Sequence, residues 1–531
     1  MIKLSQDNTR RVLDIHGWSG VVLGLLLYAV ICTGTVAVFS EEISNWSSPL
    51  AGETVEGFPV GFDDVFQRLY AEVDPRWREE VAAFVAHGGR IYLRFEGELE
   101  AQDEDAGHHQ HYGVEYQIDG NTLDVLKRTE GLEEELAASR EAGALADFFV
   151  DLHVRLHLPN PWGLFLTGVL GLGMMVAALT GFVVHRHLIR EAFTIRRNKE
   201  ALLRSRDAHV IAGTWSLPFA FVLAFTGSFF SFASSVGLPA MAMVVFSGDQ
   251  ERALAEVFNV HEPYDESPAA VANIDGMLAD ASRRGGADAV FISMNYVGRK
   301  DAFARVFTRV EEGHLSGRAF DYSAASGAFL YENPVLVGKQ PSAGNSVAAL
   351  MTPLHFGHFA GWVSKAVWFA LGFAGAYVTL TGMLLWTLRR AERPAWQRMS
   401  GAVHWMGYGL PLAMVLTAHG FFWARAIEVP VGQVQWAVFW ATAVVAAILV
   451  KTLSAQHARH WMVRFTGVGL LLLPLSRWLC DGISWMQALS YGQHVVPSLD
   501  MALLLAGGFC LWPRSNRKAE HDVVSSAEAT A

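Results

Sequence analysis

The stretch of sequence that decides the fold runs from Asp14 to Ser40 and reads DIHGWSGVVLGLLLYAVICTGTVAVFS. About 20 apolar residues at ~1.5 Å each cross the ~30 Å hydrocarbon core of a bilayer, so this stretch predicts a membrane-spanning helix. A histidine stands near its start and a Thr-Gly pair near its end. The pattern returns from Asp207 to Phe232 as DAHVIAGTWSLPFAFVLAFTGSFFSF. Such an echo indicates a duplicated unit.

The histidine and the glycine keep the same spacing in both copies. Eighteen residues separate His16 from Gly34 (34 − 16), and 18 separate His209 from Gly227 (227 − 209). Eighteen residues at ~100° each make about five whole turns, so the two residues share one helix face. We therefore expect His16 and His209 to have corresponding roles.

The composition is typical of an integral membrane protein with polar parts. Of the 531 residues, 52% are hydrophobic, and they fall in long blocks. The first span is too long for the apolar core of a signal peptide and no small-residue cleavage site follows it, so we expect it to stay as an anchor. The three cysteines, Cys32, Cys480 and Cys510, lie in or near apolar segments. This argues against a disulfide framework, a cysteine-based zinc site or an iron–sulfur cluster.

Apolar segments and the charges beside them predict eight membrane spans. Arg and Lys gather in the short segments between and beyond the spans, whereas the two long polar stretches contain acidic clusters. By the positive-inside rule both termini then lie in the cytoplasm and the two long polar stretches lie outside, in the periplasm of a Gram-negative cell. The expected location is the bacterial inner membrane. The expected spans are 15–39, 161–184, 210–234, 359–388, 402–423, 434–450, 461–475 and 498–511.

Each external stretch predicts a small α+β module of one helix and two hairpins. In the first, FDDVFQRLYAEV has the apolar spacing of a helix, and AAFVAHGGRIYLRFEGE and HYGVEYQIDGNTLDVL each predict two strands around a turn. In the second, SPAAVANIDGMLADA predicts the helix, and two later segments predict the strand pairs. The expected division is a first span at 1–40, external modules at 41–152 and 236–352, spans with a basic loop at 153–235, a fourth span at 353–395, a four-helix membrane extension at 396–513 and a disordered tail at 514–531.

Histidine is costly inside a bilayer unless it has a function, so the histidines at span ends are candidate site residues. By the expected topology His16 and His209 form a cytoplasmic tier. The external tier has two candidates in each half, one at 24 residues and one at 28 or 27 residues before a glycine of the following span. These candidates are His157 and His358 on the first spacing, and His153 and His355 on the second.

Two tiers of paired imidazoles on facing helices, without a cluster of intramembrane carboxylates, suggest b-type haem with two histidine ligands on each iron, and two haems in all. One haem near each face would divide the ~30 Å crossing into short electron hops. The alternative is that these histidines only contact lipid headgroups or form ordinary hydrogen bonds. Glycines beside the histidines would let a flat cofactor approach the helices: Gly17, Gly20, Gly213, Gly357 and Gly361.

Other histidines are weaker candidates. His185 is a further candidate for the inner tier, because Trp386 holds the corresponding position in the other half, although contact with lipid headgroups is the simpler interpretation. His404 and His419 are candidates for another haem or for a quinone. Tryptophans at the span ends are typical of interfacial belts. A metal-binding loop or a solvated hairpin tip is the interpretation of the segment that contains Asp105, His108, His109 and His111.

Three stretches resemble the PepSY-associated transmembrane-helix family: IHGWSGVVLGLLLYAVICTGTVAVF, LHVRLHLPNPWGLFLTGVLGLGMMVAALTGFVVHRHLIR and LHFGHFAGWVSKAVWFALGFAGAYVTLTGMLLW. The external modules resemble PepSY-type domains. Within the family, residues 8–395 are similar to iron-regulated inner-membrane siderophore reductases of the FoxB and PiuB kind. The extension after residue 400 departs from the minimal family pattern.

The resemblance implies haem b in the bundle, electrons taken up on the cytoplasmic side and reduction of a ferric siderophore outside. It places His16, His209 and His355 at family positions, and His153 or His157 at the remaining one. Neither GxGxxG after a strand nor a Walker A sequence is present, so quinol or a separate cytoplasmic reductase is the expected donor. Membrane lipid is the other expected partner, and no nucleic acid is expected.

The expected reaction is one-electron reduction of iron(III) in a chelate bound between the two modules. Release of iron(II) would follow because iron(II) binds hard siderophore oxygens more weakly. Two rival functions remain. A haem-free siderophore or iron permease would carry charged residues at mid-span, whereas the ionisable groups here stand at span ends. A PepSY-type periplasmic binding or regulatory protein would need no haem.

Overall fold

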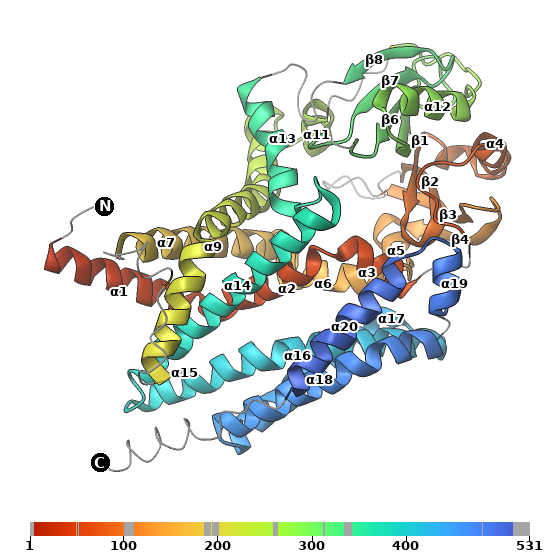
Figure 1. The fold of residues 1–531 in the computed structure, drawn as a ribbon. Helices are drawn as coiled ribbons and strands as arrows, with labels where there is room; N and C mark the ends of the chain where they lie inside the picture. The colour runs from red at the N-terminus through yellow and green to blue at the C-terminus, as the bar shows by residue number, and fades with distance from the viewer. Residues whose placement is uncertain are drawn as a thin grey trace.

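A bundle of long helices carries an eight-stranded sheet at one end (Figure 1). We call this the sheet end of the bundle and the opposite one the far end. The computed structural model describes residues 5–48, 50, 52–99, 111–184, 193, 201–258, 264–311, 314–333, 342–480 and 482–512.

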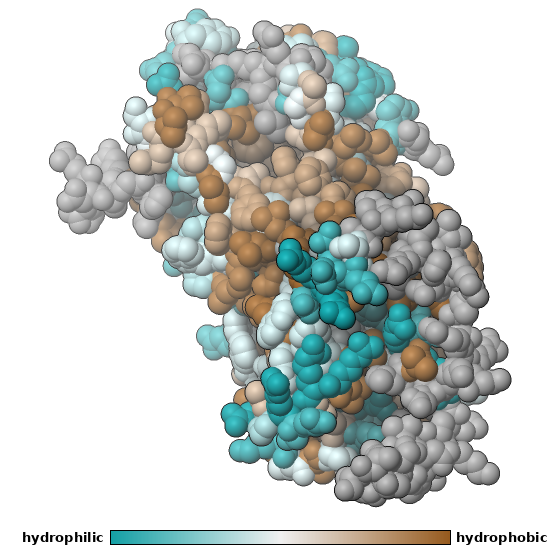
Figure 2. Space-filling model, turned by 90° about the vertical axis from the view of Figure 1, so that its left-hand side faces the viewer, coloured by the Kyte–Doolittle hydropathy of each residue, from teal (hydrophilic) through white to brown (hydrophobic). Residues whose placement is uncertain are grey.

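In the described part of the chain, five helical runs are long and apolar enough to cross a membrane. A sixth span results if α1 (Gln6–Val22) and α2 (Gly24–Ala37) are counted together. Figure 2 shows hydrophobic residues gathered across the middle of one face, with hydrophilic residues on either side. The chain is therefore a helical, multi-pass membrane protein. The five runs are α7 (Trp162–Val184), Leu203–Val245 with α9 (Ala201–Phe232) and α10 (Leu238–Val245), α14 (Gly361–Leu388), α17 (Val431–Thr452) and α18 (Ala455–Leu479).

Six of the eight expected spans coincide with these six. The eighth lies in α20 (Val495–Leu511), which has only 17 residues. The fifth lies in a helical run that is not among the candidate spans, so eight spans stays a prediction. That run consists of α15 (Pro394–His404), a π-helical segment (Trp405–Gly409) and α16 (Leu410–Ala426).

The first span is not the continuous helix expected over 15–39. α1 and α2 meet at Leu23 with a bend of 67°. Gly20 and Gly24 flank this point, and glycine has a low helix propensity. A Cβ on Gly24 would lie 2.6 Å from the sulfur of Met383, so the glycine also lets α2 approach α14 closely.

The helices after α14 pack beside the repeated part of the chain. Tyr28 of α2 donates its hydroxyl to the carbonyl of Gly407 at 2.8 Å. Gly407 lies in the π-helical segment, where a carbonyl falls outside the regular ladder and needs another donor. Near the sheet end, α19 (Trp485–Ser490) and α20 approach α3 (Ser40–Ser47), as Figure 1 shows.

The strands form one antiparallel sheet in the order β4-β3-β2-β1-β5-β6-β7-β8. Two amphipathic helices, α4 (Phe62–Glu72) and α12 (Ile274–Gly285), place apolar residues in the core of this domain, and α12 packs against the sheet. The hairpins and the two helices expected from the sequence are all present. The strands are β1 (Glu80–Ala86), β2 (Arg90–Glu98), β3 (His111–Asp119), β4 (Val125–Leu132), β5 (Ala289–Asn295), β6 (Phe303–Thr308), β7 (Ala319–Ser323) and β8 (Phe329–Asn333).

The two modules do not form separate sheets, which corrects the expectation of two small independent units. β1 pairs with β5 from Val81 opposite Met294 to Phe84 opposite Phe291. The two covering helices also cap each other. The carboxylate of Asp63 accepts from the backbone N–H of Ile274 at 2.9 Å, and the carboxylate of Asp275 accepts from that of Asp63 at 2.9 Å.

Four shorter helices connect the sheet to the bundle. The last turn of α6 carries His153, and the last turn of α13 carries His355. These two helices therefore bring two of the candidate histidines to the sheet end of the bundle. The connecting helices are α5 (Glu133–Ala138), α6 (Ala144–Arg155), α11 (Gln250–Val257) and α13 (Ala343–Phe356).

Candidate functional site

Four of the candidate histidines share one packing arrangement. Each imidazole lies against a Thr-Gly pair on a neighbouring helix, which we call its Thr-Gly seat. A Cβ on the seat glycine would lie 3.1 Å from the histidine Cε1 in three cases and 2.6 Å in the fourth, so only glycine leaves room for the ring. The four are His16 on Thr180-Gly181 of α7, His209 on Thr381-Gly382 of α14, His355 on Thr226-Gly227 of α9 and, at 2.6 Å, His153 on Thr33-Gly34 of α2.

Hydrogen bonds fix the tautomer of two of these rings directly. Nδ1 of His16 lies 2.9 Å from the carbonyl oxygen of Ala177, and Nδ1 of His153 lies 2.8 Å from that of Val30. A carbonyl oxygen only accepts, so Nδ1 carries the proton in both rings. The lone pair of each neutral imidazole is then on Nε2, which is the nitrogen that can bind a metal.

The other two rings reach the same tautomer through threonine. Nδ1 of His209 lies 3.1 Å from the hydroxyl of Thr381, and Nδ1 of His355 lies 2.9 Å from that of Thr226. Each hydroxyl already donates to the carbonyl four residues earlier in its own helix, at 2.7 Å and 2.8 Å. It therefore accepts from the histidine, and Nε2 is again the unprotonated nitrogen.

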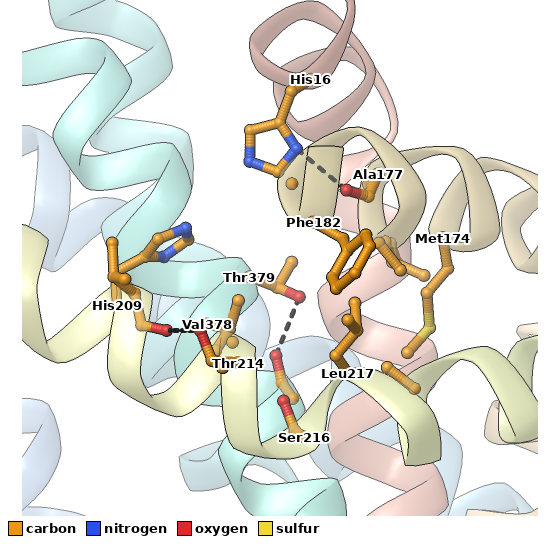
Figure 3. Close-up of a pocket in the computed structure, with 17 residues that line it drawn as sticks. His16, Met174, Ala177, Phe182, His209, Thr214, Ser216, Leu217, Val378 and Thr379 are labelled. Atoms are coloured by element: carbon orange, nitrogen blue, oxygen red, sulfur yellow. Dashed lines mark hydrogen bonds between the residues drawn. The ribbon is translucent and has the colours of Figure 1, made fainter. Parts of the chain in front are cut away.

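His16 and His209 line one pocket at the far end of the bundle (Figure 3). The pocket measures about 720 Å³, counting the space at its open side, and so has the size of a typical cofactor site. Its other lining residues are mostly apolar or small, which suits a flat and largely hydrophobic ligand. They come from α2, α7, α9 and α14 and include Met174, Phe182, Gly213, Leu217 and Gly375.

His153 and His355 meet toward the sheet end. Their ring centroids are 6.2 Å apart and their planes differ by 24°. Two imidazoles that bind one metal from opposite sides, each through a bond of about 2.0 Å, have centroids about 6 Å apart. The separation of His153 and His355 therefore fits a shared metal of this kind.

Together these observations fit b-type haem at both levels. Each level supplies two neutral imidazoles from the two halves of the repeat, oriented by hydrogen bonds at Nδ1. The glycine seats and the apolar pocket give the space that the ring of the cofactor requires. A bare metal ion fits less well, because no group of three His, Cys, Asp or Glu side chains suited to one occurs among the described residues.

The structure places the other two candidates of the external tier elsewhere. His157 follows the end of α6 and lies between Phe148, at 4.4 Å, and Trp436 of the extension, at 4.7 Å. Its Nε2 is buried without a hydrogen-bond partner in the part of the chain that the structure describes. Of the two spacings left open by the sequence, the one that meets in space is therefore that of His153 and His355. The equal spacing of His157 and His358 is misleading because the count crosses a helix break in each half.

His358 lies just before α14, close to a buried ion pair. Lys365 donates to Glu42 and lies 3.4 Å from a carboxylate oxygen of Glu41. Burial lowers the pKa of His358, and the positive charge of Lys365 lowers it further, while Glu41 acts in the opposite direction. His358 is thus held neutral beside the outer pair of histidines.

The weaker candidates fall outside this arrangement. Both ring nitrogens of His419 are engaged, Nδ1 with the hydroxyl of Ser476 at 2.8 Å and Nε2 with the carbonyl of Gly469 at 3.0 Å, so neither can bind a metal. Nδ1 of His404 lies 2.8 Å from the carbonyl of Ser400 in its own helix. His185 lies outside the described residues, as do Asp105, His108 and His109 of the proposed metal loop, whereas His111 begins β3.

The sequence reasoning did not find the threonines that orient the rings. A signal was present, because Thr-Gly recurs once in each repeated span, at residues 33–34, 180–181, 226–227 and 381–382. The glycines were singled out for helix-face spacing alone. Their contact with histidines of other helices is a tertiary relation that the spacing along one helix does not show.

Comparisons with known proteins agree with this membrane architecture. The family described as PepSY-associated TM region matches residues 13–389, a range that contains all four seated histidines. An uncharacterised protein of Pseudomonas aeruginosa is 27% identical over 264 residues, which are 47% of this chain. The match covers 64% of that relative, so the chain spans a little under two thirds of the relative's length.

Proposed function

Because the chain belongs to the family of PepSY-associated transmembrane regions, we propose that it is a haem b oxidoreductase that reduces iron(III) in a siderophore outside the inner membrane. The observation that carries this proposal is the set of four seated imidazoles. They form two pairs, one at each end of the bundle, and each pair joins the two halves of the repeat. Such pairs suit electron transfer across the membrane better than transport of a solute.

The roles of the residues follow from their contacts. His16 and His209 would hold one haem, and His153 and His355 the other. Haem iron supplies reversible one-electron oxidation and reduction. The carbonyls and threonine hydroxyls at Nδ1 keep each ring in the tautomer that presents Nε2 and make it a stronger base. The apolar walls of the bundle exclude water from the path between the two levels.

The proposed topology has eight spans and both termini in the cytoplasm. The basic segments that follow the second and fourth spans stand at the far end, as expected from the positive-inside rule. The eight-stranded sheet then lies in the periplasm, above His153 and His355. A ferric siderophore bound between the sheet and the bundle would gain one electron for each iron, and iron(II) would leave its hard oxygen ligands more readily.

Single-turnover reduction of a ferric chelate tests this function. Protein purified in full length would be reduced with dithionite, freed of excess reductant and mixed with a ferric hydroxamate or a ferric catecholate. We expect the reduced α-band to decay while an iron(II) indicator develops colour in equal amount. A reduced protein whose band persists with every chelate would contradict the proposal.

A matched pair of variants makes the test specific. His355→Ala removes a seated ring of the outer pair and is expected to abolish the reaction with the chelate. His457→Ala removes an exposed histidine whose Nδ1 contacts only Ser454 among the described residues, and is expected to behave as the wild type. Equal loss in both variants would show that the effect is not that of the outer pair.

A further inference from the structure

Three tryptophans meet at the far end of the bundle. We call Trp18 of α1, Trp386 of α14 and Trp396 of α15 the tryptophan trio. The ring centroids of Trp18 and Trp386 are 5.6 Å apart, those of Trp18 and Trp396 are 5.9 Å apart, and those of Trp386 and Trp396 are 6.1 Å apart. Aromatic contacts at these distances are attractive and hold three separate helices together.

Trp386 connects the trio to both histidines of the inner pair. A Cβ on Gly17 would lie 1.9 Å from the Trp386 ring, so the indole packs directly on the residue next to His16. Gly382, the seat of His209, is one helical turn before Trp386 on α14. The trio therefore borders the pocket of the inner pair on the side away from the sheet.

The indole N–H of Trp386 is buried and has no hydrogen-bond partner in the described part of the chain. A buried donor left unpaired costs about 1–3 kcal/mol. Four other tryptophans of this protein do satisfy their N–H inside the molecule, and a tryptophan of an interfacial belt directs it to water or to headgroups. The four are Trp46, Trp368, Trp405 and Trp485, with bonds of 2.7, 3.1, 2.8 and 2.7 Å.

A positive charge and an apolar entrance complete the surroundings. The guanidinium of Arg390 lies 3.5 Å from the centroid of the Trp386 ring. On α1, Ile15, Trp18 and Val22 are 50%, 52% and 68% exposed, so this side of the helix faces the lipid. A molecule dissolved in the bilayer can thus reach the trio without passing through water.

We propose that the tryptophan trio binds the ring of a membrane quinol, which is the electron donor. The aromatic faces accept a flat ring, and the N–H of Trp386 and the guanidinium of Arg390 donate to its oxygens. The quinol gives up two electrons and two protons and leaves as the quinone. Two iron(III) ions in the external chelate each gain one electron, and the protons enter the water at the far end. The inference rests on the proposed function for its acceptor, but the binding site itself does not depend on it.

Photolabelling tests the binding site without any redox step. An azido-ubiquinone would be irradiated with the full-length protein in lipid nanodiscs, and labelled peptides would be mapped by mass spectrometry. We expect labels within residues 5–22 and 385–398, and at least fivefold less label after competition with decylubiquinone. Labels confined to the α16–α18 side would overturn the proposal.

Stopped-flow reduction by decylubiquinol tests the role of the N–H. Trp386→Phe keeps an aromatic ring but removes the donor, and loss of one hydrogen bond predicts a fall of about tenfold in the rate of quinol reduction. Haem content should not change. Trp461→Phe is the control, because Trp461 is also a lipid-exposed tryptophan but lies on α18.

The outcomes separate this inference from the proposed function. A haem-containing protein that dithionite reduces but decylubiquinol does not would overturn the quinol site and leave the proposed function standing. An unchanged rate in Trp386→Phe, an equal fall in Trp461→Phe, or a loss of haem in Trp386→Phe would also overturn it. A protein without haem would refute the proposed function, and photolabelling would still decide the quinol site.

Discussion

The decisive residues are four histidines and the Thr-Gly pairs that seat them. The glycine gives the ring its place, and a carbonyl or a threonine hydroxyl at Nδ1 sets its tautomer. Outer contacts of this kind orient a metal ligand and raise its basicity. The same arrangement occurs four times with residues from different helices, which a set of unrelated interfacial histidines would not show.

Replacing a seat threonine tests this arrangement. Thr381→Val keeps the side-chain volume but removes the acceptor for Nδ1–H of His209. We expect about tenfold weaker haem retention and a higher midpoint potential, because a less basic imidazole stabilises iron(III) less. Haem content per chain and a redox titration measure the two effects.

Thr442→Val is the matched control for that variant. Thr442 also donates to the carbonyl four residues earlier, at 2.7 Å, but it lies on α17 and is not part of a seat. It should leave haem content and potential as in the wild type. A similar change in both variants would mean that Thr381 acts through the helix and not through His209.

A pH dependence is expected in the sheet domain, at Asp301. Its carboxylate accepts from Arg299 at 2.9 and 2.8 Å and from the backbone N–H groups of Tyr264 and Asp265 at 2.8 and 3.0 Å. The hydrogen bonds from Arg299 hold the pKa of Asp301 well below its usual value. The stability that they contribute is therefore complete above the unfolded pKa of about 4 and is lost as the pH falls through the folded pKa.

Hydrogen exchange between pH 6 and pH 3 checks this expectation. After correction for the intrinsic exchange rate, peptides around residues 264–268 and 297–302 should lose protection toward the acid end of that range. Asp301→Asn should be less protected at pH 6 and nearly independent of pH. A wild type whose protection does not change with pH would contradict the assignment.

The residue scale also shows where the sequence was sufficient. His16 and His209 could be predicted because their repeat runs along one helix in each half. His157 was an equal candidate to His153 because counting residues cannot reveal that α6 ends at Arg155 and that the chain then turns. The threonines were not predicted because their partners lie on other helices.

At the scale of elements, two helices depart from the expected regular form, and in both cases the cause is a contact. The bend at Leu23 and the π-helical segment at Trp405–Gly409 each lie where glycine allows close packing, against Met383 and Leu380 respectively. Hydrophobicity predicts that such segments are helical. It does not predict the bend or the π turn, because these depend on a neighbouring helix.

The extension is fixed to the repeated part by a buried charge. Asp500 of α20 is fully buried and accepts from Arg477 at 2.7 Å, from Trp46 of α3 at 2.7 Å and from Trp485 at 2.7 Å. Removing one partner of such a network leaves a buried charge without compensation, at a cost of about 3–5 kcal/mol. The network thus joins three helices at the sheet end.

Asp500→Asn is therefore expected to lower the thermal unfolding midpoint of the purified protein by several degrees. Asp74→Asn provides the comparison, since it removes a carboxylate from an exposed pair with Arg76 and should leave the midpoint unchanged. If the two variants melt at the same temperature as the wild type, Asp500 does not hold the extension in place.

At the scale of the whole molecule, duplication has produced a closed pair and not two separate units. The inner and outer histidine pairs each join the two halves, and the sheet joins them again through β1 and β5. The sequence predicted the strands because their hydrophobic pattern is local. It did not predict that two edge strands more than 200 residues apart would pair, because nothing local encodes that contact.

Disulfide trapping tests the joined sheet. Ala82 lies opposite Ser293 in the register of β1 and β5. With the three native cysteines replaced by alanine, Ala82→Cys and Ser293→Cys together should form a disulfide readily on mild oxidation. Ala82→Cys with Asn295→Cys is the control, because diagonal neighbours lie about 7–8 Å apart, beyond disulfide geometry. No preference for the first pair would show that the two modules are separate.

The central claim is that paired imidazoles hold a haem at each end of the bundle, and the haem content of the purified full-length protein tests it most directly. The pyridine haemochromogen spectrum should give two haems b per chain, both low-spin and six-coordinate. His209→Ala and His355→Ala should each retain one. A colourless protein, or a His209→Ala variant with an unchanged spectrum, would contradict the account.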